Sequence, residues 1–292
     1  MEWTSQITVV PTATAAVPVP QRKSWVLPVA AAVPVLLLAA AGWTFWPKTQ
    51  PPAPVQRFHV ELPAGVSFSE YVSASPDGRK LLFNATGQKN GLWIRDLDSL
   101  EFHQLAGTES AVGPTWSPDS KFITFGIGSQ LRKIDTGGGP AQTLADVSGL
   151  PVGTSSWNPE GVILFGGRGR GKIMRVPQAG GVATPVTEVD TARREAFHGL
   201  PQFLPDGKHF LYEISGPPEI AGTYIGSLDA APKEQSKQRL VPGQYVATFA
   251  DGYVFFMRES TLMGQPFEVD ALKLTGEPTP MADSVARTGS TG

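Results

Sequence analysis

Four histidines are the side chains of this sequence best suited to acid–base or metal chemistry. They are His59, His103, His198 and His209, and no cysteine accompanies them. The absence of cysteine excludes thiol catalysis, disulfides and cysteine-ligated metals. We find no established metal-ligand spacing around the histidines, so we expect no metal site. His209 follows a turn and is predicted to make a structural hydrogen bond or to face solvent.

Residues Gly166–Gly171, with the sequence GGRGRG, superficially resemble a phosphate-binding loop. The Gly-Lys-Ser/Thr ending and the following helix are missing, so we interpret the stretch as a hairpin loop. An anion contact through Arg168 and Arg170 is the alternative. No Gly-x-Ser-x-Gly elbow is present, and Arg193–Glu195 is interpreted as a solvated charged connection. The sequence therefore predicts no catalytic residue, no cofactor and no metal.

The composition favours many short strands joined by turns. Gly (32) and Pro (27) together make about a fifth of the 292 residues, a share typical of turn-rich folds. Apolar residues make up 41%, enough to bury a core. The net charge of −2 provides no basic surface for nucleic acid. We therefore expect an all-β protein that does not bind nucleic acid.

A recurring turn organises most of the chain. The turn Ser-Pro-Asp-Gly, or a close variant, begins at Ser75, Ser117, Asn158 and Leu204, and a shortened form begins at Ala250. A period of about 40–50 residues is the signature of propeller blades, each a four-stranded sheet. In such a turn Pro presets the first corner, Asp accepts backbone N–H groups, and Gly takes a left-handed conformation. The repeated Asp residues are thus predicted to serve turns rather than catalysis.

The sequences on both sides of each turn repeat as well. An aromatic residue precedes most of the turns, as at Trp116 and Trp157. Alternating apolar pairs follow the turns: Leu81/Phe83, Ile123/Phe125, Ile163/Phe165, Phe210/Tyr212 and Val254/Phe256. This alternation predicts strands whose two faces are buried between neighbouring blades. With two further strands in each unit, the fold class is a β-propeller of about five four-stranded blades. A β-sandwich is the competing fold, but it lacks the longer period.

An uncharged apolar segment, Trp25–Trp46, precedes the repeats. It provides the about 20 apolar residues of a membrane-spanning helix, with Trp at both ends, where the two interfaces favour aromatic rings. A cleaved signal peptide and a buried soluble helix are the alternatives. Arg22 and Lys23 favour an N-terminus in the cytoplasm. We expect a single-pass protein of the cytoplasmic membrane whose propeller lies outside, in the periplasm or the extracellular space.

The domain organisation follows from these features. We predict a disordered segment over 1–24, the membrane helix over 25–46, a Pro-rich linker over 47–54, the propeller over 55–286 and a tail over 287–292. The blades are expected near 71–110, 111–150, 151–196, 197–243 and 244–286.

Several stretches resemble bacterial propeller proteins. Trp116–Asp119 followed by Phe122–Phe125 is similar to the WD-like repeats of the TolB family. A second resemblance, to the C-terminal half of bacterial membrane-anchored serine/threonine protein kinases, rests on Phe58–Pro63, Trp93–Leu97, Gln202–Gly207 and Leu262–Phe267. In that family a cytoplasmic kinase domain precedes one membrane helix and an outer propeller. The resemblance covers residues 25–286.

The chain departs from the kinase family in its catalytic motifs. The strand-borne Val-Ala-Ile-Lys, the His-Arg-Asp loop and Asp-Phe-Gly are all absent, so no kinase role is carried over to any residue. The resemblance implies further blades beyond Gly292 and a ring-closing strand at Arg57–Leu62. We therefore expect an arc of five blades from a longer reading frame.

By analogy with other propellers, a partner is expected at the mouth of the central channel, on loops that precede the first strands of the blades. The predicted partner surface consists of His198, Gly199, Pro201, Gly113, Pro114, Gly153 and Thr154. We predict a non-catalytic, membrane-anchored sensor module that binds a protein or a small ligand there. The alternatives are the truncated sensor half of a serine/threonine protein kinase and the gating propeller of a serine peptidase.

Overall fold

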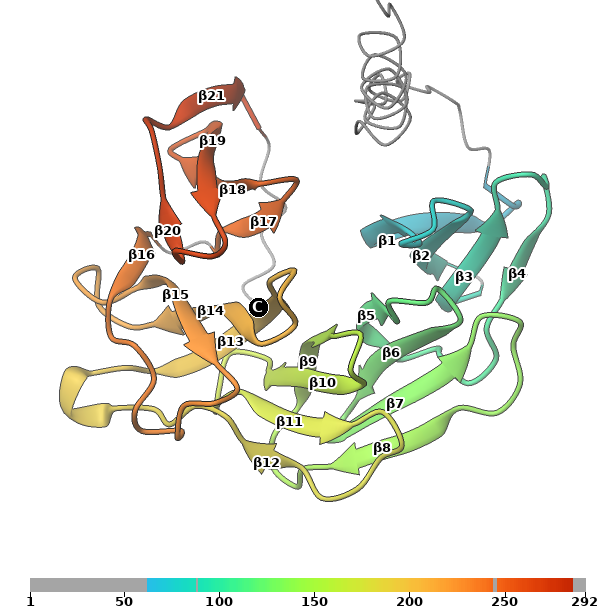
Figure 1. The fold of residues 1–292 in the computed structure, drawn as a ribbon. Helices are drawn as coiled ribbons and strands as arrows, with labels where there is room; N and C mark the ends of the chain where they lie inside the picture. Colours follow the sequence, from blue (N-terminus) through green and yellow to red (C-terminus); the bar gives the residue numbers. More distant parts are fainter. Residues whose placement is uncertain (1–61, 88, 244–245, 286–292) are drawn as a thin grey trace, which may run out of the picture. The chain divides into compact units, whose positions relative to one another are not determined.

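The computed structural model describes residues 62–285, except 88 and 244–245 (Figure 1). This part contains strands β1 to β21 and one short 3₁₀ helix, η1 (Thr191–Arg193). The expected membrane helix over 25–46, the linker over 47–54 and the first strand up to residue 61 lie outside the described residues. Within the described ranges, no helix is long and apolar enough to cross a bilayer.

The strands form five antiparallel sheets in chain order (Figure 1). The first sheet holds β1 (Val66–Ala74), β2 (Lys80–Gly87), β3 (Gly91–Asp96) and β4 (Phe102–Gln104). The second holds β5 (Val112–Trp116), β6 (Phe122–Ile127), β7 (Gln130–Asp135) and β8 (Gln142–Asp146). The third holds β9 (Val152–Trp157), β10 (Val162–Gly167), β11 (Met174–Pro177) and β12 (Thr184–Pro185). The fourth holds β13 (Phe197–Phe203), β14 (His209–Ser215), β15 (Gly222–Ser227) and β16 (Arg239–Pro242). The fifth holds β17 (Thr248–Ala250), β18 (Tyr253–Arg258), β19 (Thr261–Glu268), β20 (Lys273–Leu274) and β21 (Thr279–Ala282).

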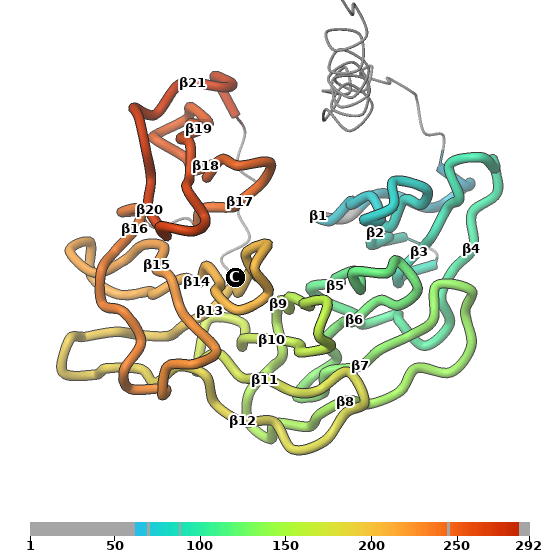
Figure 2. The backbone as a smooth tube through the Cα atoms, in the orientation of Figure 1, coloured from blue at the N-terminus to red at the C-terminus, as the bar shows by residue number. Residues whose placement is uncertain are grey.

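Each sheet is one blade, so the prediction of an all-β propeller with five blades is confirmed. Figure 2 shows the same order along the backbone trace. The fifth blade differs from the expected four strands, because β20 and β21 both pair with β19 and share its outer edge. Between them lie Gly276, with a φ of 62°, and Pro278, which has no N–H to donate. These residues interrupt the ladder and split the fourth strand into two pieces.

The core lies between successive blades. Ile123 and Phe125 of β6 share a buried cluster with Leu82 of the preceding blade. In the same way, Leu164 of β10 packs against Phe210 of the following blade. The apolar pair of a blade thus faces the blade before it, and the residue between the pair faces the blade after it. This arrangement buries both faces of the second strand, as the sequence pattern predicts.

The repeated turns have the expected hydrogen bonds. Gly78 N donates to Ser75 O at 2.8 Å, and Gly207 N donates to Leu204 O at 3.0 Å. The φ angles of 69° at Gly78 and 66° at Gly207 place both glycines in the left-handed region. The fifth turn is different in kind, because Asp251 also has a positive φ of 53°. Positive φ at both central residues is the type I′ hairpin geometry, which explains why the proline is missing there.

The turn aspartates bond within their own turns, as predicted, so they serve structure. Asp77 accepts from Arg79 N at 3.1 Å, and Asp206 accepts from Lys208 N at 3.0 Å. The turns of neighbouring blades also touch: Asp77 N donates to Ser120 Oγ at 3.1 Å. The sequence repeat therefore marks contacts between blades as well as corners within them.

Acid is expected to weaken the folded protein partly through Asp119. Ser117 Oγ donates to Asp119 Oδ1 at 2.6 Å, and this bond holds the pKa of the carboxyl below its ordinary value of 3.8. A carboxyl with a depressed pKa contributes its full stability above pH 3.8, and that contribution is lost as the pH falls through the folded-state pKa. We expect Asp119→Asn to flatten the decline of the melting temperature between about pH 5 and pH 2. Asp98→Asn, at an exposed carboxyl with no side-chain hydrogen bond in the described part, is the control and should leave the decline unchanged.

Candidate functional site

The residues predicted to face a partner lie in β-bulges of the inner strands. Gly113 and Pro114 stand opposite the single residue Phe125, because β5 and β6 lose register between Val112 and Thr115. The same irregularity occurs in β9 at Gly153 and Thr154. It recurs in β13 between Gly199 and Gln202, the stretch that contains Pro201. Bulges bend strands and leave residues out of the ladder, so these three blades share one structural device.

The bulges of neighbouring blades are in direct contact. A Cβ added to Gly113 would lie 2.4 Å from Gly153 O, and one added to Gly166 would lie 3.3 Å from Gly199 Cα. None of the seven predicted residues is exposed, and only Gly113 and Thr154 are half-buried. The structure therefore brings the glycines together as packing contacts. Whether Thr154 and Gly113 meet a partner stays a prediction.

A cavity lies on another part of the fourth blade, beside His198. Its volume is about 430 Å³, which lies within the usual range for small-molecule sites. Two connections form it: residues 186–196, which lead from β12 to β13, and residues 228–238, which lead from β15 to β16. Tyr212 and Ile214 of β14 line it together with residues of both connections. Two loops and the strands β13 and β14 thus line one small, partly open space.

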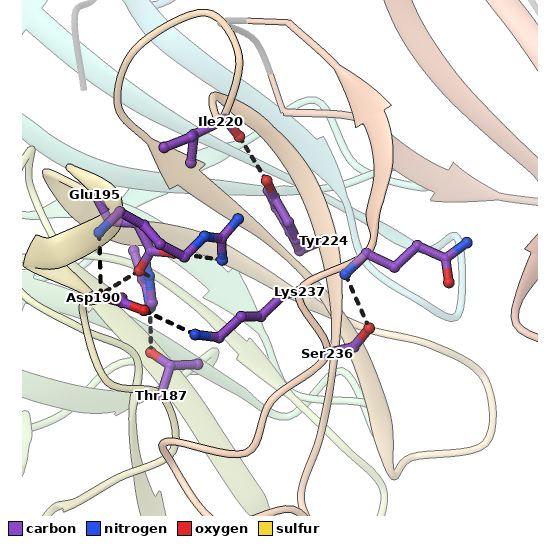
Figure 3. A network of polar contacts seen from close by, with 10 residues as sticks. Thr187, Asp190, Glu195, Ile220, Tyr224, Ser236 and Lys237 are labelled. Carbon is purple, nitrogen blue, oxygen red and sulfur yellow. Dashed lines mark hydrogen bonds and ion pairs between the residues drawn. The ribbon is translucent and has the colours of Figure 1, made fainter.

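Glu195 is the centre of the polar network at this cavity (Figure 3). Its Oε2 accepts from Asp190 N at 2.7 Å and lies 3.0 Å from His198 Nε2. Arg193 Nη1 donates to Oε1 at 2.9 Å. The side chain of Glu195 is only 2% exposed and that of His198 only 3%. A carboxylate this deeply buried needs such donors, because desolvation disfavours its charge.

Helix η1 places these groups. Asp190 caps it by accepting from Arg193 N at 3.3 Å, and Arg194 ends it with a φ of 64°. The left-handed residue turns the chain back, so Glu195 N donates to Asp190 O at 3.2 Å. This reversal directs Glu195 inward, three residues before His198.

Two contacts join the loops that enclose the cavity. Gln235, which is 8% exposed, donates through Nε2 to Val186 O at 3.0 Å. Lys237 Nζ donates to Asp190 Oδ2 at 2.8 Å (Figure 3). This contact to Lys237 is the main reason that the pKa of Asp190 lies below its ordinary value. Both contacts connect residues that are far apart in the sequence, and both lie at the wall of the cavity.

The acid, the imidazole and the hydroxyl of this network are arranged in the order of a hydrolase triad, but the hydroxyl is not accessible to a substrate. Thr187 Oγ1 lies 2.8 Å from His198 Nδ1, so acid, imidazole and hydroxyl follow one another. Thr187 is, however, completely buried, and its Oγ1 also accepts from Ile173 N at 3.0 Å. It does not line the cavity. A nucleophile must reach its substrate, so this arrangement supports the fold and the wall of the cavity.

Burial also sets the protonation states. It lowers the pKa of His198, and the adjacent Glu195 opposes this effect only in part. The imidazole is therefore neutral at pH 7. Burial raises the pKa of the Tyr212 hydroxyl, which consequently remains a hydrogen-bond donor.

The prediction that Arg193–Glu195 is a solvated connection is wrong for Glu195, which is buried at the cavity, whereas Arg194 is exposed. The Glu-x-x-His spacing from Glu195 to His198 is the signal in the sequence that could have indicated this contact. In the described part, no group of three or more His, Asp or Glu is arranged to hold a metal ion.

His209 bonds Asp206 Oδ2 at 2.6 Å, as predicted. Gly166–Gly171 joins β10 to β11 as a hairpin loop with Arg168 and Arg170 exposed, so that interpretation is confirmed.

Solved structures show what this architecture is similar to. TolB from Acinetobacter baumannii matches with a TM-score of 0.55 at 14% identity, over 75% of this chain and 55% of that chain. A protein from Agrobacterium tumefaciens assigned as TolB gives a TM-score of 0.55 at 18% identity, over 73% of this chain and 80% of that one. The fold is a TolB-like β-propeller.

The similarity to TolB concerns the fold and says nothing about a ligand. No family model and no curated protein matches this sequence. The chain spans only 55% of the length of the Acinetobacter protein. A prolyl endopeptidase matches with a TM-score of 0.50 at 15% identity, over 73% of this chain and 35% of that chain. Function must therefore be argued from the site itself.

Proposed function

We propose that this TolB-like propeller is a non-catalytic sensor module that binds a small ligand in the cavity beside His198. The observation that carries the proposal is the preorganised wall of that cavity. Glu195 has three donors in place, and Lys237 joins the two enclosing loops through Asp190. A site whose polar groups are already held in position loses little conformational freedom when a ligand binds.

The proposal includes a membrane anchor. Trp25–Trp46 provides an uncharged segment of suitable length, and Arg22 and Lys23 favour the cytoplasm for the N-terminus. The propeller would then lie outside the cytoplasmic membrane, where it samples the periplasm or the extracellular space.

Alkaline phosphatase fused after Gly292 of the full chain is expected to be active, because this enzyme folds only outside the bacterial cytoplasm. A fusion joined after Ser24, before the apolar segment, is the matched control and should be inactive. The active fusion should stay in the membrane pellet after a carbonate wash. An inactive but well-expressed full-length fusion would contradict the outside placement. Release into the soluble fraction would instead favour a cleaved signal peptide.

A second candidate is the sensor half of a serine/threonine protein kinase. The observation that favours it is the kinase-like set of stretches, among them Trp93–Leu97 and Leu262–Phe267, together with the apolar segment before them. Sequencing the DNA upstream of Met1 tests it. An in-frame kinase domain would support this candidate, whereas an independent promoter and start would exclude it.

A further inference from the structure

One nearly buried hydroxyl at the cavity has no partner among the residues that the structure describes. Tyr212 is 1% exposed and lines the cavity, and its hydroxyl makes no hydrogen bond within the described part of the chain. Its neighbour Tyr224, by contrast, donates to Ile220 O at 2.7 Å (Figure 3). No fully enclosed polar side-chain atom in the described ranges lacks a partner. The Tyr212 hydroxyl is therefore open to the cavity, and a buried phenol normally has a partner.

The cavity is lined by one ammonium that forms no ion pair within the described part of the chain. The carboxylates are all engaged: Glu195 with Arg193, Asp190 with Lys237, and Glu188 with Lys172, at 2.9, 2.8 and 2.7 Å. Lys233 lines the same cavity and forms no ion pair with any described residue. The free polar groups thus include a neutral phenol and an ammonium, and both of them are donors.

The remaining lining is mixed, because the hydroxyl-bearing Thr191 and Ser236 line the cavity beside apolar residues. Val189, Ala192, Ile214 and Pro232 contribute to the wall. An anionic occupant that accepts hydrogen bonds from the phenol and the ammonium, and that presents an apolar body to these residues, would complement the cavity.

We infer that the cavity binds a small organic monocarboxylate, with its carboxylate held by the Tyr212 hydroxyl and the Lys233 ammonium. This inference rests on the proposed function in one respect, that the cavity is a ligand site. It adds the chemical class of the ligand and the two residues that select it.

Fluorine NMR titration of the full chain in detergent tests the inference, with para-fluorobenzoate as the probe. The neutral isostere para-fluorobenzamide has the same ring but no charge. We expect the carboxylate to bind roughly tenfold more tightly than the amide, because hydrogen bonds to a charged group are the stronger ones. Equal affinities for the two compounds would overturn the inference.

Two variants locate the contact. Tyr212→Phe removes only the hydroxyl and is expected to weaken binding of para-fluorobenzoate by roughly tenfold. Lys233→Gln should weaken it by about two- to fivefold, because that charge is solvent-exposed. Lys89→Gln, at an exposed lysine of the first blade, is the matched control and should change nothing.

The fold of the tyrosine variant can be checked within the same chain. Because the Tyr212 hydroxyl has no partner, Tyr212→Phe should keep the melting temperature, whereas Tyr224→Phe should lower it by removing a buried hydrogen bond. Unchanged probe affinity in a folded Tyr212→Phe protein would overturn the inference. So would the absence of probe binding up to the solubility limit. Neither result would change the outcome of the phosphatase-fusion experiment. The membrane placement and the ligand inference can therefore fail independently of each other.

Discussion

Glu195→Ala is expected to lower the free energy of unfolding by about 2–4 kcal/mol. The substitution removes the acceptor for Asp190 N, Arg193 Nη1 and His198 Nε2 at once. The imidazole would remain buried without its partner, and the Arg193 guanidinium would lose its counter-ion. A buried donor that loses its acceptor keeps its desolvation penalty, which applies to Asp190 N and His198 Nε2. The Arg193 side chain is 28% exposed, so water replaces part of its lost contact. Urea-induced unfolding measures the change.

Glu219→Ala is the matched control for this prediction. Glu219 forms an ion pair with Arg194, but the two side chains are 57% and 67% exposed. Exposed pairs contribute at most about 1 kcal/mol, since water and salt screen them. Equal losses in the two variants would show that Glu195 has no special role. A small loss in Glu195→Ala would mean that the neighbouring loops relax and admit water.

Gly113→Ala is expected to destabilise the protein by roughly 2–5 kcal/mol, because two costs combine. The first is a φ of 56°, which L side chains rarely adopt. The second is the contact between the new Cβ and Gly153 O, at 2.4 Å, with Thr154 Cα at 2.9 Å. Both opposing atoms belong to the backbone of the next blade, so neither can rotate away. Thermal and chemical unfolding measure the loss.

Gly128→Ala separates the two costs. Gly128 has nearly the same φ, 58°, but nothing lies within 4 Å of an added Cβ. The Gly128→Ala variant should lose about 1–2 kcal/mol of unfolding free energy, from the backbone conformation alone. A Gly113 variant as stable as the Gly128 variant would mean that the blades can separate at the bulge. That outcome would favour an open inner strand that a partner can reach.

The sequence by itself determined the five blades. Each blade contains a turn in which Pro, Asp and Gly have separate conformational roles. These roles depend on residues adjacent in the chain, so they can be identified from the sequence. The alternating pairs that follow, such as Ile123 and Phe125, predict a strand because their spacing alone assigns them to one face. Buried second strands could be predicted for the same reason.

Only the tertiary structure decided the site. Glu195 stands in a run of charged residues that is typical of a solvated loop, and its burial depends on the left-handed residue Arg194 and on His198 in the next strand. Lys237 reaches Asp190 from a different connection of the same propeller. The sequence does not show that the Tyr212 hydroxyl lacks a partner within the described ranges, because there the residue is one more apolar position of a strand. Periodicity predicts which face of a strand a side chain occupies, whereas a cavity forms from loops whose contacts follow no period.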